Sequence, residues 1–174
     1  MNNQENRELP QTAPSLPLYF PVSPLKLIVM SVCTGGIYEL YWFYKNWGLI
    51  KERENVDIMP FWRAFFSYFF CYSLFKKFHS TTIDSPLEKS ISPVLLSTGW
   101  VVVSMLWKLP EPYWLISYSS VLFLLPAQAM ANEINSIVAP NHDRNRKFTS
   151  FNIFGVIIGS LFFFLILLGT FILK

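Results

Sequence analysis

The sequence predicts an all-α fold, an integral membrane helical bundle, from three observations. Residues 151–173 carry no charged side chain, and a helix of that length, at about 1.5 Å per residue, covers the roughly 30 Å of a hydrocarbon core. Hydrophobic residues make up 52% of the 174 residues and charged residues 14%, well below the roughly one quarter usual in soluble domains. Four further apolar segments precede the terminal one. Together these features indicate that lipid surrounds most of the chain.

The first 24 residues form a polar tail in which five prolines recur: Pro10, Pro14, Pro17, Pro21 and Pro24. Proline lacks an amide donor and disfavours helix in the residue before it. The tail has no apolar core of the kind found in cleaved signal peptides. We therefore predict that residues 1–24 are disordered and that residues 25–174 form a single helical membrane domain.

The five apolar segments differ in how well they suit a membrane crossing: residues 25–44, 61–78, 91–109, 112–130 and 151–173. In the second segment, Arg63 and Lys76 enclose a short uncharged run, and runs of about 10–14 residues are more often interfacial than spanning. The third and fourth segments are separated only by a proline-rich stretch at residues 108–112, which predicts an antiparallel hairpin.

The distribution of basic residues favours one arrangement of these segments, because cytoplasmic loops carry an excess of Lys and Arg. Five spans would divide the 14 Lys and Arg residues 8 to 6, whereas an interfacial second segment would divide them 10 to 4. We therefore predict four spanning helices plus one interfacial or half-inserted aromatic helix, with both termini outside the cytoplasm. Five spans are the alternative. The predicted minority comprises Arg7, Lys26, Lys108 and Lys174.

One acidic residue, Glu39, lies inside an apolar segment, and Arg63 is expected to return to the same side of the membrane. A guanidinium can hold a carboxylate through two parallel hydrogen bonds, which predicts an ion pair at the membrane boundary. Ionisable groups at membrane depth also mark transport pathways. If Glu39, Arg63 and Asn132 converged on one polar cavity, transport would be favoured; dispersal would favour a structural role.

Two further patterns predict helix contacts. Gln128, Asn132 and Asn135 fall at i, i+4 and i+7, on one helix face, and are expected to bind a neighbouring helix or to line a water-filled entry. Gly155 and Gly159 form a G-x-x-x-G motif, which allows close approach of another backbone, either within the chain or in a homodimer.

Motifs of the common catalytic, nucleotide-binding and metal-binding sites are missing from the sequence. We therefore expect no catalytic residue, no metal site and no cofactor. The expected partners are the lipid bilayer and other membrane proteins or a second copy, not nucleic acid. The prediction is a non-enzymatic, multi-pass protein of the cell membrane with an interaction or envelope-organising role. The alternative is a small transporter or ion-conducting subunit that uses Glu39 and Arg63.

Residues 34–45 carry the sequence TGGIYELYWFYK, and residues 55–60 carry NVDIMP. This stretch resembles an uncharacterised family of small bacterial multi-pass membrane proteins that share a T-x-G-I-Y-x-x-Y-W-x-Y-K aromatic core. The resemblance covers about residues 25–80. It implies a protein of the bacterial inner membrane in which the second segment crosses, and it implies no activity and no site residues.

Overall fold

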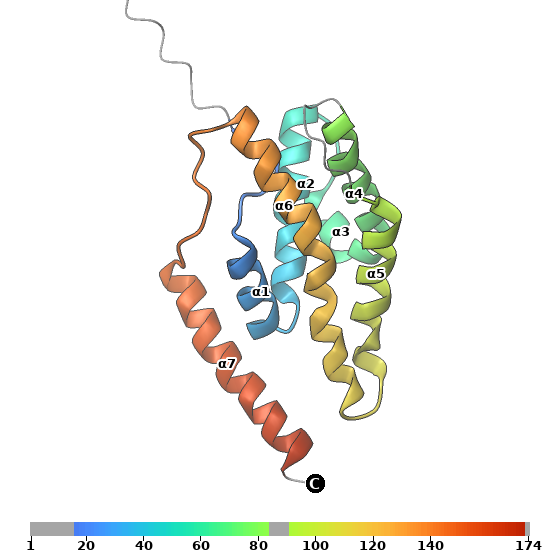
Figure 1. Ribbon diagram of the computed structural model, residues 1–174, viewed down its shortest axis with the longest axis vertical. Coiled ribbons are helices and arrows are strands. Elements are labelled where there is room, and N and C mark those ends of the chain that lie inside the picture. Colours follow the sequence, from blue (N-terminus) through green and yellow to red (C-terminus); the bar gives the residue numbers. More distant parts are fainter. Residues whose placement is uncertain (1–15, 84–90, 173–174) are drawn as a thin grey trace, which may run out of the picture.

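The computed structural model describes residues 16–83 and 91–172, of which 76% are helical and none lies in a strand (Figure 1). The predicted all-α fold is therefore confirmed. Helices α2, α4, α5 and α6 lie side by side, and α1 lies between α2 and α7, which forms one edge of the bundle (Figure 1).

The first apolar segment forms two helices, not one. Helix α1 (Pro24–Cys33) begins at the N-cap Ser23, and α2 (Ile37–Glu54) runs back along it after a turn (Figure 1). Gly35 and Gly36 make the turn with φ of 58° and 87°, a left-handed conformation that glycine adopts without steric cost. The predicted continuous helix over residues 25–44 is wrong, because α1 is about 15 Å long and the chain then reverses.

The second apolar segment is also divided. Helix α3 (Pro60–Phe65) ends at Phe66, and α4 (Ser67–Ile83) follows. Phe66 has a ψ of 37°, which lies outside the helical range and separates the two helices. Helix α3 packs along α2 and leaves Phe61, Trp62 and Phe65 at least half exposed. The predicted single helix over residues 61–78 is therefore wrong.

The hairpin predicted from the proline-rich stretch is confirmed. Helix α5 (Pro93–Met105) continues into the short helix η1 (Leu106–Lys108), and η2 (Tyr113–Ser120) leads back into α6 (Val121–Val138). The two arms pack against each other along their length (Figure 1). The returning arm is longer than residues 112–130, because its helix continues to Val138.

Helix α7 (Ser150–Phe171) begins at a capping box in which the side chains of Thr149 and Asn152 bond each other's backbone N–H groups. Among the described residues, two helical runs are long and apolar enough to cross a membrane: Tyr113–Val138, with 26 residues, and Ser150–Phe171, with 22. The run Pro93–Lys108 is apolar but shorter. Two of the four predicted spans therefore have the required length.

The segment that precedes α1 is ordered by burial. Tyr19 and Val22 are completely buried and Phe20 is 6% exposed. Tyr19 packs edge-to-face on Phe78 of α4, with ring centroids 4.1 Å apart. The predicted disorder of the tail is therefore wrong for residues 16–23, because apolar side chains between the prolines bury themselves in the bundle. Residues 1–15 lie outside the described residues.

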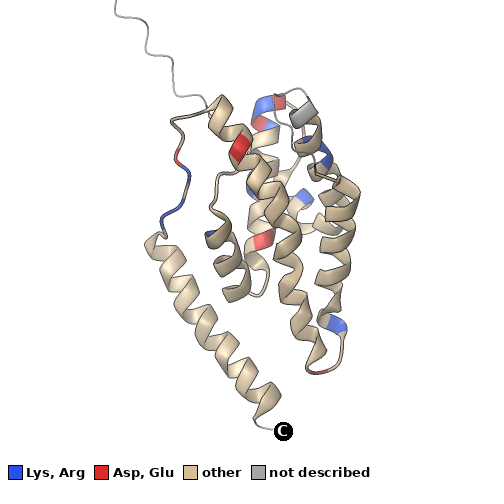
Figure 2. Ribbon diagram, in the orientation of Figure 1, with Lys and Arg blue, Asp and Glu red and all other residues tan. Residues whose placement is uncertain are grey.

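Charged residues gather at one end of the molecule (Figure 2). Lys, Arg, Asp and Glu occupy the end where α2 and α4 finish and where the α6–α7 connection begins (Figure 2). Toward the other end, the described charges are Glu39, in the first turn of α2, and those of the α5–η2 turn, and α7 has none (Figure 2). We call these two halves the charged end and the apolar end.

Candidate functional site

A cavity of about 460 Å³ opens in the apolar end, between the tip of the α1–α2 hairpin, the α3–α4 junction and the α5–η2 hairpin. Glu39 is the one ionisable acid or base of its described lining other than tyrosine. Four serines add hydroxyl groups to the wall: Ser31, Ser104, Ser117 and Ser120. Aromatic rings make up much of the remaining wall, from Tyr68, Trp100, Trp107, Trp114 and Tyr118.

The Glu39 carboxylate is 3% exposed and is held by donors from two other elements. Trp100 of α5 donates its indole N–H to Oε2 over 2.6 Å, and Ser120 of η2 donates its hydroxyl to Oε1 over 3.0 Å. A typical intramolecular hydrogen bond contributes about 1 kcal/mol net. The carboxylate therefore ties α2 to both arms of the hairpin.

Arg63 lies away from this cavity. Its guanidinium stacks over the Trp47 ring at 4.4 Å and the Phe70 ring at 5.2 Å. Trp47 follows Glu39 by more than two helical turns, about 12 Å along α2. Glu39 is bonded to Trp100 and Ser120, and Arg63 stacks on two aromatic rings, so the predicted Glu39–Arg63 pair is wrong.

The predicted polar face of α6 binds the N-terminal segment. Asn135 donates to the Tyr19 carbonyl over 2.7 Å and accepts from the Tyr19 amide over 3.1 Å. Gln128 donates to the Phe20 carbonyl, and Asn132 donates to the Val22 carbonyl. The backbone of the N-terminal segment has no helix or sheet partners, so these side-chain amides satisfy its N–H and C=O groups.

The partner of this polar face is therefore the backbone of the N-terminal segment, residues 19–22, whereas a helix or a water-filled entry was expected. Asn132 and Arg63 do not line the cavity that contains Glu39. The three residues are dispersed, and by the criterion set out above dispersal favours structural roles for Arg63 and Asn132.

The G-x-x-x-G motif packs α7 against α1. A Cβ atom on Gly159 would lie 1.8 Å from the Cys33 carbonyl oxygen, so only glycine allows the two backbones to approach this closely. A Cβ atom on Gly155 would meet the Met30 methyl at 4.0 Å, an ordinary contact. The motif therefore serves an internal contact, and Gly159 determines it.

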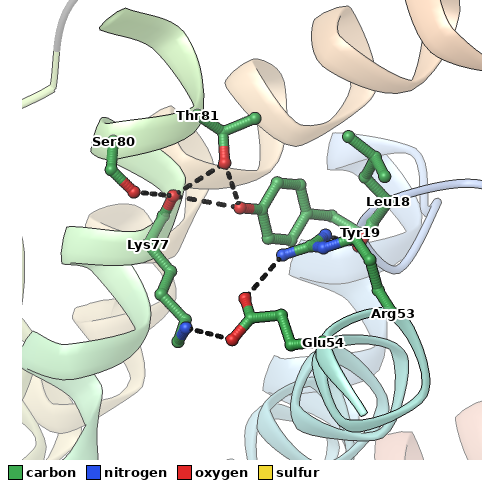
Figure 3. Close-up of polar contacts among 7 residues, drawn as sticks. All are labelled: Leu18, Tyr19, Arg53, Glu54, Lys77, Ser80 and Thr81. Carbon is green, nitrogen blue, oxygen red and sulfur yellow. Dashed lines mark hydrogen bonds and ion pairs between the residues drawn. The ribbon is translucent and has the colours of Figure 1, made fainter. Parts of the chain in front are cut away.

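Hydrogen bonds at the charged end attach residues 18 and 19 to α2 and α4 (Figure 3). The Tyr19 hydroxyl donates to the Lys77 carbonyl over 3.0 Å, and Arg53 donates to the Leu18 carbonyl over 2.9 Å. Glu54 accepts from both Lys77 and Arg53 (Figure 3). Partial burial alone would raise the pKa of the Glu54 carboxyl, but its hydrogen bonds to Lys77 and Arg53 and their charges lower it overall.

Lys26, near the start of α1, is bonded to the α6–α7 connection. Its ammonium group donates to Asn145 Oδ1 over 2.7 Å and to the Lys147 carbonyl over 2.9 Å. The predicted topology puts Lys26 and Lys147 on opposite sides of the membrane. Direct contact between them makes that assignment wrong.

The cavity residues Trp100, Ser120 and Ser31 were not singled out from the sequence. One signal existed: Ser97, Trp100 and Ser104 fall at i, i+3 and i+7, so they share a face of α5. Serine and tryptophan are common in membrane helices, however, and their contact with Glu39 arises only from packing. Among the described residues, no group of three or more His, Cys, Asp or Glu could hold a metal ion.

No family model matches the chain, and neither a curated protein nor a solved structure is significantly similar to it. The resemblance of residues 25–80 to a bacterial membrane family therefore stays a prediction.

Proposed function

We propose that this is a multi-pass protein of the cell membrane in which the α5–α6 hairpin and α7 cross the bilayer. The α1–α2 hairpin enters from the charged end and returns to it. The observation that carries this proposal is the contact of Leu18 with Arg53 and of Lys26 with Lys147, because each contact joins segments of the charged end.

The charge distribution supports this arrangement. With three crossings, ten of the eleven Lys and Arg residues in the described ranges lie at or toward the charged end, and Lys108 alone lies at the opposite turn. For the same eleven residues the four-span arrangement gives a smaller asymmetry, 9 to 2. The positive-inside rule then assigns the charged end to the cytoplasm. The N-terminal segment is then cytoplasmic and α7 ends outside.

Cysteine accessibility tests this topology. In a variant with both native cysteines replaced by serine, Leu16→Cys, at a position 74% exposed, should be labelled from the cytoplasmic side, as should Glu52→Cys. Lys108→Cys should be labelled from outside. The four-span arrangement predicts the same labelling of Glu52→Cys and Lys108→Cys, but it puts Leu16 outside. Labelling of Leu16→Cys from outside would therefore refute the proposal.

For its role, we propose a non-enzymatic interaction function in the membrane, carried by α7. None of the apolar window of α7 is buried within the protein, and Leu161, Ile157 and Leu165 are each more than half exposed. Leu161 lies about 200° around the helix from Gly159, on the face opposite α1. Such a face is available to the helix of another membrane protein, and a second copy of this chain is the first partner to test.

Disulfide trapping in native membranes tests this contact. In the variant without native cysteines, Leu161→Cys should form an oxidant-dependent dimer. Leu95→Cys on α5, 65% exposed, is the matched control and should not. If Leu161→Cys yields no more dimer than Leu95→Cys, the proposed self-association is wrong, and lipid is the neighbour of this face of α7.

The second candidate is a small transporter or ion-conducting subunit. The observation in its favour is the cavity that has a buried carboxylate in its wall. Arg63 takes no part in this cavity, so a transport role would rest on Glu39 alone. Flux of a substrate through reconstituted vesicles that Glu39→Gln abolishes would favour this candidate.

A further inference from the structure

We propose that the cavity at the apolar end binds a small organic ammonium ion, with Glu39 as its counter-ion and the tryptophan rings around it. This inference concerns the cavity alone. It stands or falls separately from the topology and from the α7 contact, because its test measures ligand binding to the isolated protein.

The charge of the cavity wall favours a cation. Glu39 is almost fully buried, and no Lys or Arg belongs to the described lining of the cavity. A buried carboxylate needs an opposite charge or a proton to offset its lost hydration. Trp100 and Ser120 supply two donors, whereas a carboxylate has about four acceptor sites. The group therefore retains acceptor capacity for a cation that enters the cavity.

The cavity wall also contains an unsatisfied polar atom. The Ser31 hydroxyl is 2% exposed, lines the same cavity and has no hydrogen-bond partner. Buried hydroxyl groups are nearly always bonded, so an orphaned one points to a ligand or solvent group that completes it. A ligand with both a positive charge and a hydroxyl or N–H group would satisfy Ser31 and Glu39 together.

The shape and lining of the cavity select an organic cation over a metal ion. Hard metal ions require six or more oxygen ligands, and the cavity offers one carboxylate with scattered hydroxyl groups. Tryptophan gives the strongest cation–π attraction, and three tryptophans line the wall: Trp100, Trp107 and Trp114. A volume of about 460 Å³ also falls within the range of small-molecule sites.

Choline is a suitable probe, because its neutral isostere 3,3-dimethylbutan-1-ol differs only in having carbon in place of the charged nitrogen. Titration of the full chain in phosphatidylglycerol nanodiscs, followed by tryptophan fluorescence and by dialysis with labelled choline, should show choline binding at least tenfold more tightly than the isostere. Equal binding of the two probes, or no binding of either, would overturn the proposal.

Variants identify the residues responsible. Glu39→Gln keeps an oxygen acceptor for Trp100 and should weaken choline binding at least tenfold. Glu52→Gln, an exposed acid on the same helix, should bind like the wild type. If Glu39→Gln fails to fold, Trp107→Leu replaces it, because Trp107 is 60% exposed and lines the cavity. It should weaken choline binding several-fold and leave isostere binding nearly unchanged.

Two sources could supply the same cation, a free ammonium compound or a lipid headgroup. Replacing phosphatidylglycerol by phosphatidylcholine in the nanodiscs separates them. If this replacement changes the tryptophan fluorescence of the wild type but not that of Glu39→Gln, the lipid headgroup is the ligand. If the fluorescence does not change and free choline still binds, the ligand is the soluble ion. Unaltered choline affinity in folded Glu39→Gln would contradict the role of the carboxylate, as would effective competition by sodium or potassium ions.

Discussion

At the charged end, side-chain amides bond the backbone of the N-terminal segment to α6, whereas at the apolar end α7 packs on α1 with its closest approach at Gly159. The first contact consists of buried hydrogen bonds, each contributing about 1 kcal/mol net. The second depends on van der Waals packing where the backbones of α1 and α7 meet at Gly159. The charged end is therefore held together by polar contacts within the protein, whereas α7 leaves most of its apolar side chains exposed.

The largest effect is expected at the contact of α7 with α1, where the two backbones leave no room for a side chain at Gly159. Ser160→Cys should form a disulfide with Cys33, because the serine oxygen and the Cys33 sulfur lie 3.5 Å apart. Adding Gly159→Ala should nearly abolish this disulfide, since its Cβ atom would overlap the Cys33 carbonyl and displace α7. Gly155→Ala is the matched control and should leave disulfide formation almost unchanged. The measurement is gel mobility after mild oxidation in a Cys71→Ser background.

The next effect tests the charged end. Asn135→Ala leaves the amide and carbonyl of Tyr19 buried without partners and should lower the free energy of unfolding by about 2–4 kcal/mol. Ser136→Ala changes an exposed neighbour and should stay within about 0.5 kcal/mol of the wild type. Near-UV circular dichroism during unfolding in detergent measures both. Equal stability of the two variants would mean that the N-terminal segment contributes little.

A smaller effect separates Arg63 from Glu39. Arg63→Gln removes the stacking on Trp47 and Phe70 and should cost about 1 kcal/mol of stability. Because the two residues share no partner, the losses in Arg63→Gln and Glu39→Gln should add to within about 0.5 kcal/mol in the double variant. Strong non-additivity in this double-mutant cycle would restore the ion pair that the sequence predicts.

The smallest effect concerns the ion pairs of Glu54. Since the folded-state pKa of Glu54 lies below its ordinary value of about 4.5, its contribution to stability is present above that value and is lost as the pH falls through the folded-state pKa. Glu54→Gln should therefore lower stability by less than about 1 kcal/mol at neutral pH and remove part of the loss on acidification. Unfolding measured at neutral and acidic pH, at low and high salt, gives both quantities. A larger loss at acidic than at neutral pH would contradict this sign.

The features that could be predicted from the sequence are those set by residues close to one another along the chain. The long run without charged residues predicts α7, and the proline-rich stretch predicts the hairpin. The i, i+4, i+7 spacing correctly puts Gln128, Asn132 and Asn135 on one helix face. Each of these inferences depends on neighbours within one or two helical turns. The same reasoning failed for residues 25–44, because an apolar run is compatible both with a crossing and with a reversal at Gly35 and Gly36.

The sequence alone therefore determined the helical class, the long apolar helix and the faces on which polar groups lie, since these follow from composition and helical periodicity. Only the tertiary structure decided which groups meet. Trp100 and Ser120 are 61 and 81 positions from Glu39, and Asn135 is 116 positions from Tyr19. The physical reason is that a buried polar group requires a partner but does not specify which one. The packing of α1, α2, α5 and α6 supplies it.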